Sequence, residues 1–440
     1  MTQSAPLLLI HVLFLSLLPL TITSSPTIEA ECLLKWKNSL ISSLSLNSSW
    51  SLTNIGNLCN WTGIACDTTG SVSEINLSET ELEGTLAKFD FSSFPGLTDF
   101  NLGTNKLNGS LPSMIGGLTE LQYLSFYNNC LVGTIPYQIT NLQKICFNYN
   151  KLASEFPGFT TDCRNLTYHD LAQNQLTDAI PESAFQPPKP SPRKKPIQWS
   201  NSCRNPCELT LWVIPSSFTN LSKISELGLS GNFLSGKISP YLITNWTELI
   251  SLQVKSNSFT GEIPSEIGLL EKLNYLFLYD NGFYGSIPSE IGNLKEFGTV
   301  PPEIGNLTSL TVLDLSTNKL HGELPETLSL LNKLETLSAF ANNFLGTIPT
   351  ELGENSPNLM NVSFANNRFS GELPPGLCNG FALQHLTVNE GNNFTGPLLE
   401  CLMNCTRLFP VRLEGNQFTG DISEAFGVHP SLNFISLSGN

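Results

Sequence analysis

Residues 310–325 of this 440-residue chain read LTVLDLSTNKLHGELP, and residues 334–349 read LETLSAFANNFLGTIP. Both stretches carry apolar residues at matching positions, then an asparagine (Asn318 or Asn342), then a glycine and a proline at matching spacing. The pattern also occurs at residues 121–136, and its period is about 24 residues. Repetition of one unit at a fixed period of this size predicts a solenoid, in which stacked units bury a shared core.

The unit has the form L-x-x-L-x-L-x-x-N-x-L followed by G-x-I/L-P, which is a leucine-rich-repeat consensus. One such unit cannot bury its apolar face by itself, so neighbouring units must stack. We therefore expect an α/β solenoid, a leucine-rich-repeat superhelix with a parallel sheet of about 14 strands along its concave side.

An asparagine follows the short strand of each unit. Pointing inward, its amide can hydrogen-bond the backbone of adjacent turns, which would otherwise leave buried polar groups unpaired. We therefore expect these asparagines to be structural and not catalytic. The expected ladder consists of Asn105, Asn129, Asn150, Asn174, Asn232, Asn257, Asn281, Asn318, Asn342, Asn367, Asn392, Asn416 and Asn440.

The N-terminal segment, residues 1–25, has the features of a secretory signal peptide. An apolar run from Leu7 to Leu20 is followed by small and polar residues, although no Lys or Arg precedes the run. The alternative is an N-terminal anchor helix, for which the run is short. No later stretch approaches 18 uninterrupted apolar residues, so we expect no membrane span in this chain.

Residues 26–70 differ from the repeats and predict an N-terminal cap. Cys59 and Cys66 are close in sequence, and in a secreted chain such a pair predicts a disulfide that clamps the cap. Trp61, between them, is expected to cover the open end of the first repeat. The alternative is two free thiols.

Repeats fill residues 71–185 and 212–440, and the last one is cut short. The repeat pattern fails at residues 186–211, an irregular segment rich in Pro and Lys. It fails again at Lys295 to Val300, as though most of a repeat were removed and two halves joined. The first break is either a functional loop or an insertion without function, including an error in the coding sequence. We favour the insertion, because such segments rarely pack.

Charge and composition exclude several functions. The net charge of −15 disfavours nucleic acid as a partner, because an acidic chain repels phosphate backbones. The histidines and cysteines do not form a complete zinc-ligand pattern, so we expect no metal or other cofactor. No nucleophile elbow, phosphate-binding loop or kinase motif is present, so we expect no enzymatic activity from this chain.

Asparagine-linked glycosylation sequons support a secreted protein. Those expected to carry glycan are Asn76, Asn108, Asn165, Asn220, Asn245, Asn306, Asn361 and Asn393. Asn60 and Asn404 also lie in sequons, but each is next to a cysteine and is expected to be blocked.

The remaining candidate function is binding on the concave sheet, where the x residues of the unit point outward. Exposed aromatic side chains in a row are typical of a groove for an extended peptide or another protein. The alternative is ordinary strand composition, because Tyr and Phe favour strands. The candidate ligand-binding residues are Tyr275, Phe277, Tyr279, Asp280, Tyr123, Tyr127, Tyr168 and Asp170.

The Cys59–Cys66 cap, the G-x-I-P step and strings such as residues 214–222 (IPSSFTNLS) resemble the ectodomains of plant leucine-rich-repeat receptor-like kinases. The resemblance covers residues 28–185 and 212–440 and implies the plant type of repeat. It implies an extracellular superhelix that binds a secreted peptide or protein ligand, a possible leucine-rich-repeat co-receptor, and a place in the secretory pathway, outside the cell or at the plasma membrane. This chain lacks the later repeats, second cap, membrane helix and Ser/Thr kinase of that plan.

The resemblance also implies a bridge between neighbouring turns, Cys378–Cys405. No partner is assigned to Cys32, Cys130, Cys146, Cys163, Cys203, Cys207 or Cys401. Two further functional hypotheses stay open. One is a secreted inhibitor of cell-wall hydrolases with a similar repeat, and the other is a non-functional truncated receptor product.

Overall fold

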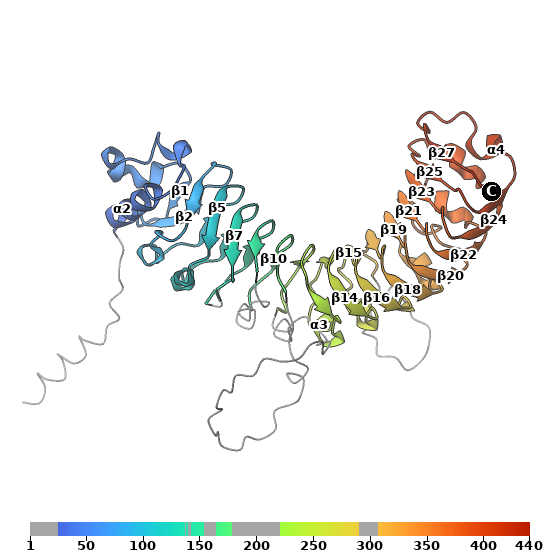
Figure 1. Cartoon of the computed structure of the whole chain (residues 1–440), viewed down its shortest axis with the longest axis horizontal. Helices are drawn as coiled ribbons and strands as arrows, with labels where there is room; N and C mark the ends of the chain where they lie inside the picture. The colour runs from blue at the N-terminus through green and yellow to red at the C-terminus, as the bar shows by residue number, and fades with distance from the viewer. Residues whose placement is uncertain (1–24, 137, 140–141, 154–163, 178–220, 290–306) are drawn as a thin grey trace, which may run out of the picture.

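The computed structural model describes residues 25–136, 138–139, 142–153, 164–177, 221–289 and 307–440. The chain forms an open arc, with the N-terminal cap at one raised end and the last repeats at the other (Figure 1). The two halves of the arc belong to one solenoid, because one sheet runs through both of them. The predicted leucine-rich-repeat fold is confirmed.

The concave side of the arc is one long sheet. Among the described residues it has 15 strands, in which β1 is antiparallel to β2 and every later pair is parallel and in register. The strands are β1 (Ile64–Cys66), β2 (Val72–Asn76), β4 (Asp99–Asn101), β6 (Tyr123–Ser125), β8 (Lys144–Cys146), β10 (Tyr168–Asp170), β11 (Glu226–Gly228), β13 (Ser251–Gln253), β15 (Tyr275–Phe277), β17 (Val312–Asp314), β19 (Thr336–Ser338), β21 (Asn361–Ser363), β23 (His385–Thr387), β25 (Val411–Arg412) and β27 (Ile435–Ser436).

A second layer of short parallel strands follows the ladder asparagines, and the sequence analysis did not anticipate it. In the described part of the chain it forms one sheet of 4 strands and one of 8. The first holds β3 (Glu83–Thr85), β5 (Lys106–Ser110), β7 (Cys130–Gly133) and β9 (Lys151–Leu152). The second holds β12 (Ser235–Gly236), β14 (Ser258–Gly261), β16 (Gly282–Gly285), β18 (Lys319–Gly322), β20 (Asn343–Gly346), β22 (Arg368–Gly371), β24 (Asn393–Pro397) and β26 (Gln417–Thr419).

Helices are short and close the outer side of the turns. Helix α2 begins where the Ser25 side chain accepts a hydrogen bond from the Ile28 amide, with proline at the first helical position. The α-helices are α2 (Pro26–Lys37), α3 (Pro240–Ile243) and α4 (Ile422–Phe426). The 3₁₀ helices are η1 (Leu44–Leu46), η2 (Leu52–Asn60), η3 (Phe91–Ser93), η4 (Ser113–Gly117), η8 (Ser265–Leu269), η10 (Glu326–Leu330), η11 (Pro375–Cys378) and η12 (Glu400–Asn404).

The N-terminal cap covers the first end of the core with tryptophans. Trp50 and Trp61 are buried, and their ring centroids lie 5.4 Å apart. The predicted disulfide is present, because Cys59 and Cys66 are joined with their Cα atoms 5.5 Å apart. The cap is also tied to the sheet by Glu29, whose buried carboxylate accepts a hydrogen bond from the Val72 amide at 3.0 Å. Burial raises the pKa of that carboxyl.

The asparagine ladder forms as predicted. Asn367 shows the pattern: its Oδ1 accepts the Phe344 amide of the preceding turn at 3.1 Å. Its Nδ2 donates to the carbonyls of Ala339 at 2.8 Å and Phe364 at 3.1 Å. Every predicted member makes bonds of this kind, and Asn440 bonds Leu413 and Leu437 in the same way. The ladder therefore satisfies buried backbone groups at each bend.

The first break in the repeat pattern does not interrupt the sheet. Residues 186–211 lie outside the described residues, but the turns on either side of them stack directly. The Leu176 amide donates to Oδ1 of Asn232, 56 residues further on, at 3.1 Å. Strand β10 accordingly pairs with β11, with Tyr168 beside Glu226.

The second break does not interrupt the sheet either. Residues 290–306 lie outside the described residues, yet β15 pairs directly with β17, and the Phe283 amide donates to Oδ1 of Asn318, 35 residues on, at 3.0 Å. The equivalent hydrogen bond from a backbone amide to a ladder asparagine joins residues 22 positions apart elsewhere, as between Leu320 and Asn342. The interval between these two turns is therefore longer than elsewhere, and the expected junction of two half-repeats at Lys295 to Val300 lies outside the described residues and stays a prediction.

The second expected disulfide is wrong in its pairing. Cys378 is bonded to Cys401, 23 residues on, with Cα atoms 5.7 Å apart, and not to Cys405. The separation is close to one repeat, so η11 and η12 stack and bring the first two cysteines together. Cys405 is free and fully buried. Cys32, Cys130 and Cys146 are also free, and Cys163, Cys203 and Cys207 lie outside the described residues.

One core position departs from the consensus. His169 occupies the inward leucine position of β10, beside Ile145 and Leu227, and it is fully buried. Burial lowers the pKa of its imidazole to about 3. The ring is therefore neutral in the folded protein at ordinary pH.

The described residues contain neither a membrane-spanning helix nor a cluster of metal ligands. No helix in that part of the chain is long and apolar enough to cross a membrane. Within the same ranges, no group of three His, Cys, Asp or Glu side chains could hold a metal ion.

Candidate ligand-binding groove

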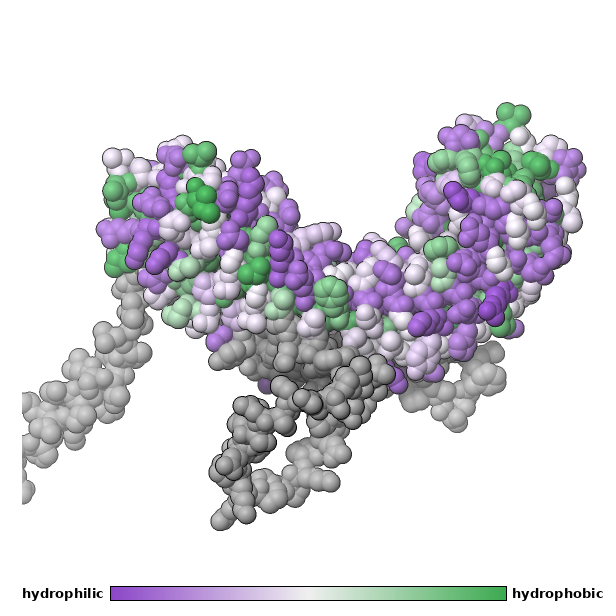
Figure 2. All heavy atoms as spheres, in the orientation of Figure 1, coloured by the Kyte–Doolittle hydropathy of each residue, from purple (hydrophilic) through white to green (hydrophobic). Residues whose placement is uncertain are grey.

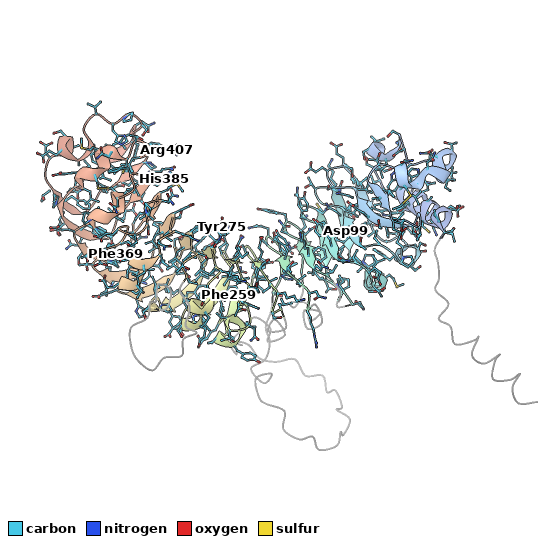
Figure 3. All side chains as sticks on the ribbon, turned by 180° about the vertical axis from the view of Figure 1, so that it is seen from behind. Asp99, Phe259, Tyr275, Phe369, His385 and Arg407 are labelled. Carbon is cyan, nitrogen blue, oxygen red and sulfur yellow. A yellow bond between two sulfur atoms is a disulfide. The ribbon has the colours of Figure 1, made fainter. Side chains whose placement is uncertain are left out.

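The register of the concave sheet aligns the candidate residues across consecutive strands. Tyr123 lies beside Lys144, which lies beside Tyr168, and Tyr168 lies beside Glu226. Ser251 follows, and then Tyr275. These side chains alternate with the buried leucines, so they point to the concave side. In the stick view the concave side runs from Asp99 past Tyr275 to His385 (Figure 3).

The aromatic side chains of β15 form a stacked pair on this surface. Tyr275 is exposed, Phe277 is half-buried, and their rings are parallel with centroids 6.4 Å apart. Tyr279, just beyond the strand, is half-buried. The Lys255 ammonium lies 5.4 Å from the Phe277 ring and 5.2 Å from the Tyr279 ring. The cluster therefore combines apolar surface with a cation held by the rings.

Asp280 has a different setting from the aromatic residues. It is exposed, but it lies in the turn that leads to Asn281, with a left-handed φ of 55°. Asx side chains tolerate that conformation better than most residues. The turn therefore partly explains why an aspartate occupies position 280. The residue lies at the edge of the concave surface.

Tyr123 opens onto a hollow of about 560 Å³. The hollow is lined by Asp99, Gln122, Tyr123, Gln143, Lys144, Cys146 and Tyr168. Burial raises the pKa of Tyr123, and it raises that of the Cys146 thiol to about 11, so both groups are neutral. Tyr127 lies over the backbone of Gly103, where any added Cβ would come within 2.1 Å of the ring. The Tyr127 ring can therefore pack against the sheet here only because residue 103 is a glycine.

Tyr168 and Asp170 line a second hollow of about 260 Å³ on the next strands. Asp170 accepts a hydrogen bond from the Ala172 amide at 3.0 Å. Burial, and then the nearby Glu226 charge, raise the pKa of Asp170. Burial also raises the pKa of Tyr168. Because Tyr168 lines both hollows, they are neighbours along β4 to β13, and the β15 aromatic cluster follows them on the same sheet; these surfaces together are called the groove.

The groove contains residues that the sequence analysis did not single out: Glu226, Gly228 and Lys255. Asp170 and Gly228 are 58 positions apart, so their contact was hidden by the intervening segment. The later strands carry smaller outward residues, Ser338, Ser363 and Thr387. Larger groups among the later strands include Phe340 beside β19, His385 on β23, and Arg412, which lies 5.2 Å from the Phe434 ring. Apolar side chains gather most densely at this C-terminal end of the visible face (Figure 2).

The candidate glycosylation sites are spread over several surfaces. Asn76, Asn165 and Asn393 are exposed, and Asn108 and Asn245 are half-buried. Asn361 is half-buried on β21 of the concave sheet, where its amide donates to Thr336 at 2.9 Å and its oxygen contacts His385. Asn220 and Asn306 lie outside the described residues. Glycosylation remains a prediction at all of these positions.

Family models match the cap and the repeats separately. Residues 28–67 match the leucine rich repeat N-terminal domain, and residues 120–142, 272–294, 309–331 and 358–379 match the leucine rich repeat. The parallel concave sheet and the asparagine ladder agree with both matches. The molecule is therefore a leucine-rich-repeat solenoid with an N-terminal repeat cap.

Individual proteins with similar sequences come from plants. The leucine-rich repeat receptor-like serine/threonine-protein kinase RGI4 of Arabidopsis thaliana is 38% identical over 107 residues, which are 24% of this chain and 10% of that protein. Receptor-like protein 41 of the same species is 35% identical over 213 residues, 46% of this chain and 23% of that protein. The chain thus matches less than a quarter of the length of either relative, and it shares with the kinase only repeats.

A solved structure resembles the whole arc. The Arabidopsis receptor kinase HAESA, in complex with the peptide hormone IDA and the co-receptor SERK1, has a TM-score of 0.65 and 27% identity, covering 92% of this chain and 70% of that one. The chain carries the leucine rich repeat N-terminal domain and leucine rich repeats, and its homologues are plant leucine-rich-repeat receptor-like kinases and receptor-like proteins.

Proposed function

We propose that this chain is the extracellular recognition domain of a plant leucine-rich-repeat receptor-like protein, and that it binds a secreted peptide or protein ligand in the concave groove. The observation that carries the proposal is the row of outward side chains from Asp99 to Tyr279, in which two neighbouring hollows are followed by the aromatic cluster of β15. The similarity to HAESA, a receptor solved with a peptide hormone and a co-receptor, supports it.

The pairing of the strands determines the direction in which a peptide can bind. Each groove strand is already paired with a neighbour on both sides, so its backbone cannot take up a further strand. A peptide must therefore lie across the strands and contact the outward side chains. The seven strands from β4 to β15 span about 29 Å at ~4.8 Å per strand, which accommodates about nine extended residues. Exposed tyrosine and phenylalanine then act as rigid contact surfaces.

Recruitment of a second receptor is the remaining part of the proposal. A ligand held at the surface of the arc leaves one side accessible to another protein, so a leucine-rich-repeat co-receptor can contact both. The location that follows is outside the cell, or at the plasma membrane if the natural gene product carries a membrane helix.

The proposal can be tested with selected peptides. A displayed library of random nonapeptides is panned on the wild-type chain, and the dissociation constants of the selected peptides are then measured. The triple variant Tyr275→Ala, Phe277→Ala and Tyr279→Ala should bind them about tenfold or more weakly, because central aromatic contacts dominate such interfaces.

A matched control comes from the same sheet. Phe340, next to β19 and outside the groove, is 39% exposed, so Phe340→Ala removes an exposed aromatic ring without touching the groove. It should leave the affinity unchanged. Failure to select any peptide, or equal binding by the triple variant and wild type, would refute concave capture.

A further inference from the structure

The second hollow of the groove is open because a glycine, Gly228, lies in its wall. It is called here the β11 hollow, and the residues that define it are Tyr149, Tyr168, Asp170, Glu226, Gly228 and Ser230. Gly228 occupies an outward position on β11, directly beside Asp170. A Cβ atom at 228 would lie 2.7 Å from Oδ1 of Asp170. Glycine therefore leaves the Asp170 carboxylate open to the cavity.

The β11 hollow has an uncompensated negative charge. Asp170 and Glu226 both line it, and neither forms an ion pair within the described part of the chain. Lys255 also lines the cavity, but its ammonium lies over the Phe277 and Tyr279 rings. Lys144 lines the neighbouring hollow instead. The repulsion between the two carboxylates would be relieved by a cation placed between them.

A buried hydroxyl in the wall of the hollow lacks a partner. Ser230 is 2% exposed, lines the hollow, and its Oγ makes no hydrogen bond to any described residue. Buried polar groups in folded proteins are nearly always paired, so the Ser230 hydroxyl, which is covered in the free chain, is an acceptor left without a donor in the wall of the hollow. The hydroxyl oxygen can accept a hydrogen bond from a cationic N–H donor.

The remaining walls are aromatic. Tyr149 is 58% exposed and Tyr168 is half-buried, and both line the cavity. The face of a tyrosine ring attracts a guanidinium or ammonium group electrostatically. Carboxylates, ring faces and a free acceptor are thus gathered in one cavity of about 260 Å³, which is large enough for a cationic side chain.

We propose that the β11 hollow binds a cationic group of the ligand, either the guanidinium of an arginine or a free ammonium group. The proposal deepens the concave-capture function and rests on it for the biological ligand. The cation lies between Asp170 and Glu226, donates charge-assisted hydrogen bonds to their carboxylates, and covers the Tyr168 ring. The hollow therefore fixes the register of the peptide on the sheet, because only a cationic position can occupy it.

Small probes test the hollow without knowledge of the natural ligand. Nα-acetyl-arginine amide presents a guanidinium, glycinamide presents only an ammonium, and Nα-acetyl-citrulline amide is a neutral counterpart of the first. Isothermal titration of the wild-type chain should show at least one cationic probe binding about tenfold more tightly than citrulline amide, because charge-assisted hydrogen bonds exceed neutral ones. The preference should weaken with added salt. Which of the two cationic probes binds identifies the source of the cation.

Variants separate charge from shape. Asp170→Asn with Glu226→Gln should remove the preference for the cation. Gly228→Ala should weaken cation binding although both carboxylates remain, because its Cβ fills the hollow. The matched control is Asp314→Asn, on β17, where the carboxylate accepts the amide two residues on, as Asp170 does. It should bind the probes like wild type, and melting temperatures verify that each variant folds.

The outcomes are distinct from those of the peptide selection. Equal binding of citrulline amide and both cationic probes, or unchanged cation binding after the Asp170 and Glu226 substitutions, overturns the hollow as a cation site. Selected peptides that need Tyr275, without any cation preference in the probes, would leave the groove function standing and overturn only the hollow. Cation binding without any selected peptide would support the hollow and contradict concave capture.

Discussion

The two sides of the concave strands differ in a simple way. The inward side repeats the same leucines and asparagines from β4 to the end of the chain, and the outward side changes at almost every strand. Asn367 and Asn342 make equivalent bonds one turn apart, whereas the outward neighbours Tyr275 and Val312 have little in common. The inward side therefore supplies stability, and the outward side is free to specify a ligand.

The largest effect is expected from an inward polar residue. Asn367→Leu removes the partners of the Phe344 amide and of the Ala339 and Phe364 carbonyls, all in a buried setting. Leaving such groups unpaired should lower the free energy of unfolding by about 2–4 kcal/mol. Denaturant unfolding followed by circular dichroism measures this. A variant as stable as wild type would show that the ladder is not needed for stability.

A second inward substitution should act only at acidic pH. The pKa of His169 is about 3 in the folded chain, against an ordinary value of 6.5, so below pH 6.5 the unfolded chain binds more protons than the folded one. Stability should therefore be complete above that pH and fall as the pH decreases toward 3. The loss should be about 2–3 kcal/mol at pH 4.5.

His169→Leu restores the consensus residue and should remove most of this dependence. Melting temperatures of both proteins between pH 7 and 4.5 provide the measurement. If the two proteins lose stability in parallel as the pH falls, another group controls the acid sensitivity.

The smallest effect is expected on the outward side. Ser338→Ala and Thr387→Ala alter half-buried side chains that face the concave side on β19 and β23. Ser338→Ala should change the free energy of unfolding by less than about 0.5 kcal/mol, because surface substitutions away from caps and networks rarely do more. Thr387→Ala also removes a part-buried hydrogen bond to Oγ of Ser363 and should cost at most about 1 kcal/mol. A loss comparable to that of Asn367→Leu would show that the two sides of the strand are not independent.

The sequence predicted the inward side well, for a physical reason. Leucines and asparagines at a fixed spacing determine how neighbouring units stack, so the conformation of each unit can be predicted from its own sequence. The thirteen-member ladder and the Cys59–Cys66 bridge were both confirmed from such local patterns.

The outward side was less predictable, because it depends on which strands become neighbours. The β11 hollow joins Asp170 to Gly228 across a long segment, and the place of Lys255 over Phe277 depends on side-chain direction. The choice of Cys401 over Cys405 likewise depends on which cysteine points into the core. A glycine at an outward strand position was the one available sign of the hollow.

The hydrogen bonds of the asparagine ladder join residues 56 and 35 positions apart as well as residues 22 positions apart. Adjacent strands therefore pair whether the chain between their asparagines is short or long. A genetically encoded reporter domain could be placed within either long interval while the strands keep their partners. Because the first interval separates Asp170 from Glu226 and the second follows Tyr279, such a fusion would report on ligand capture from a point close to the groove residues in sequence, which gives this solenoid a use as a sensor scaffold.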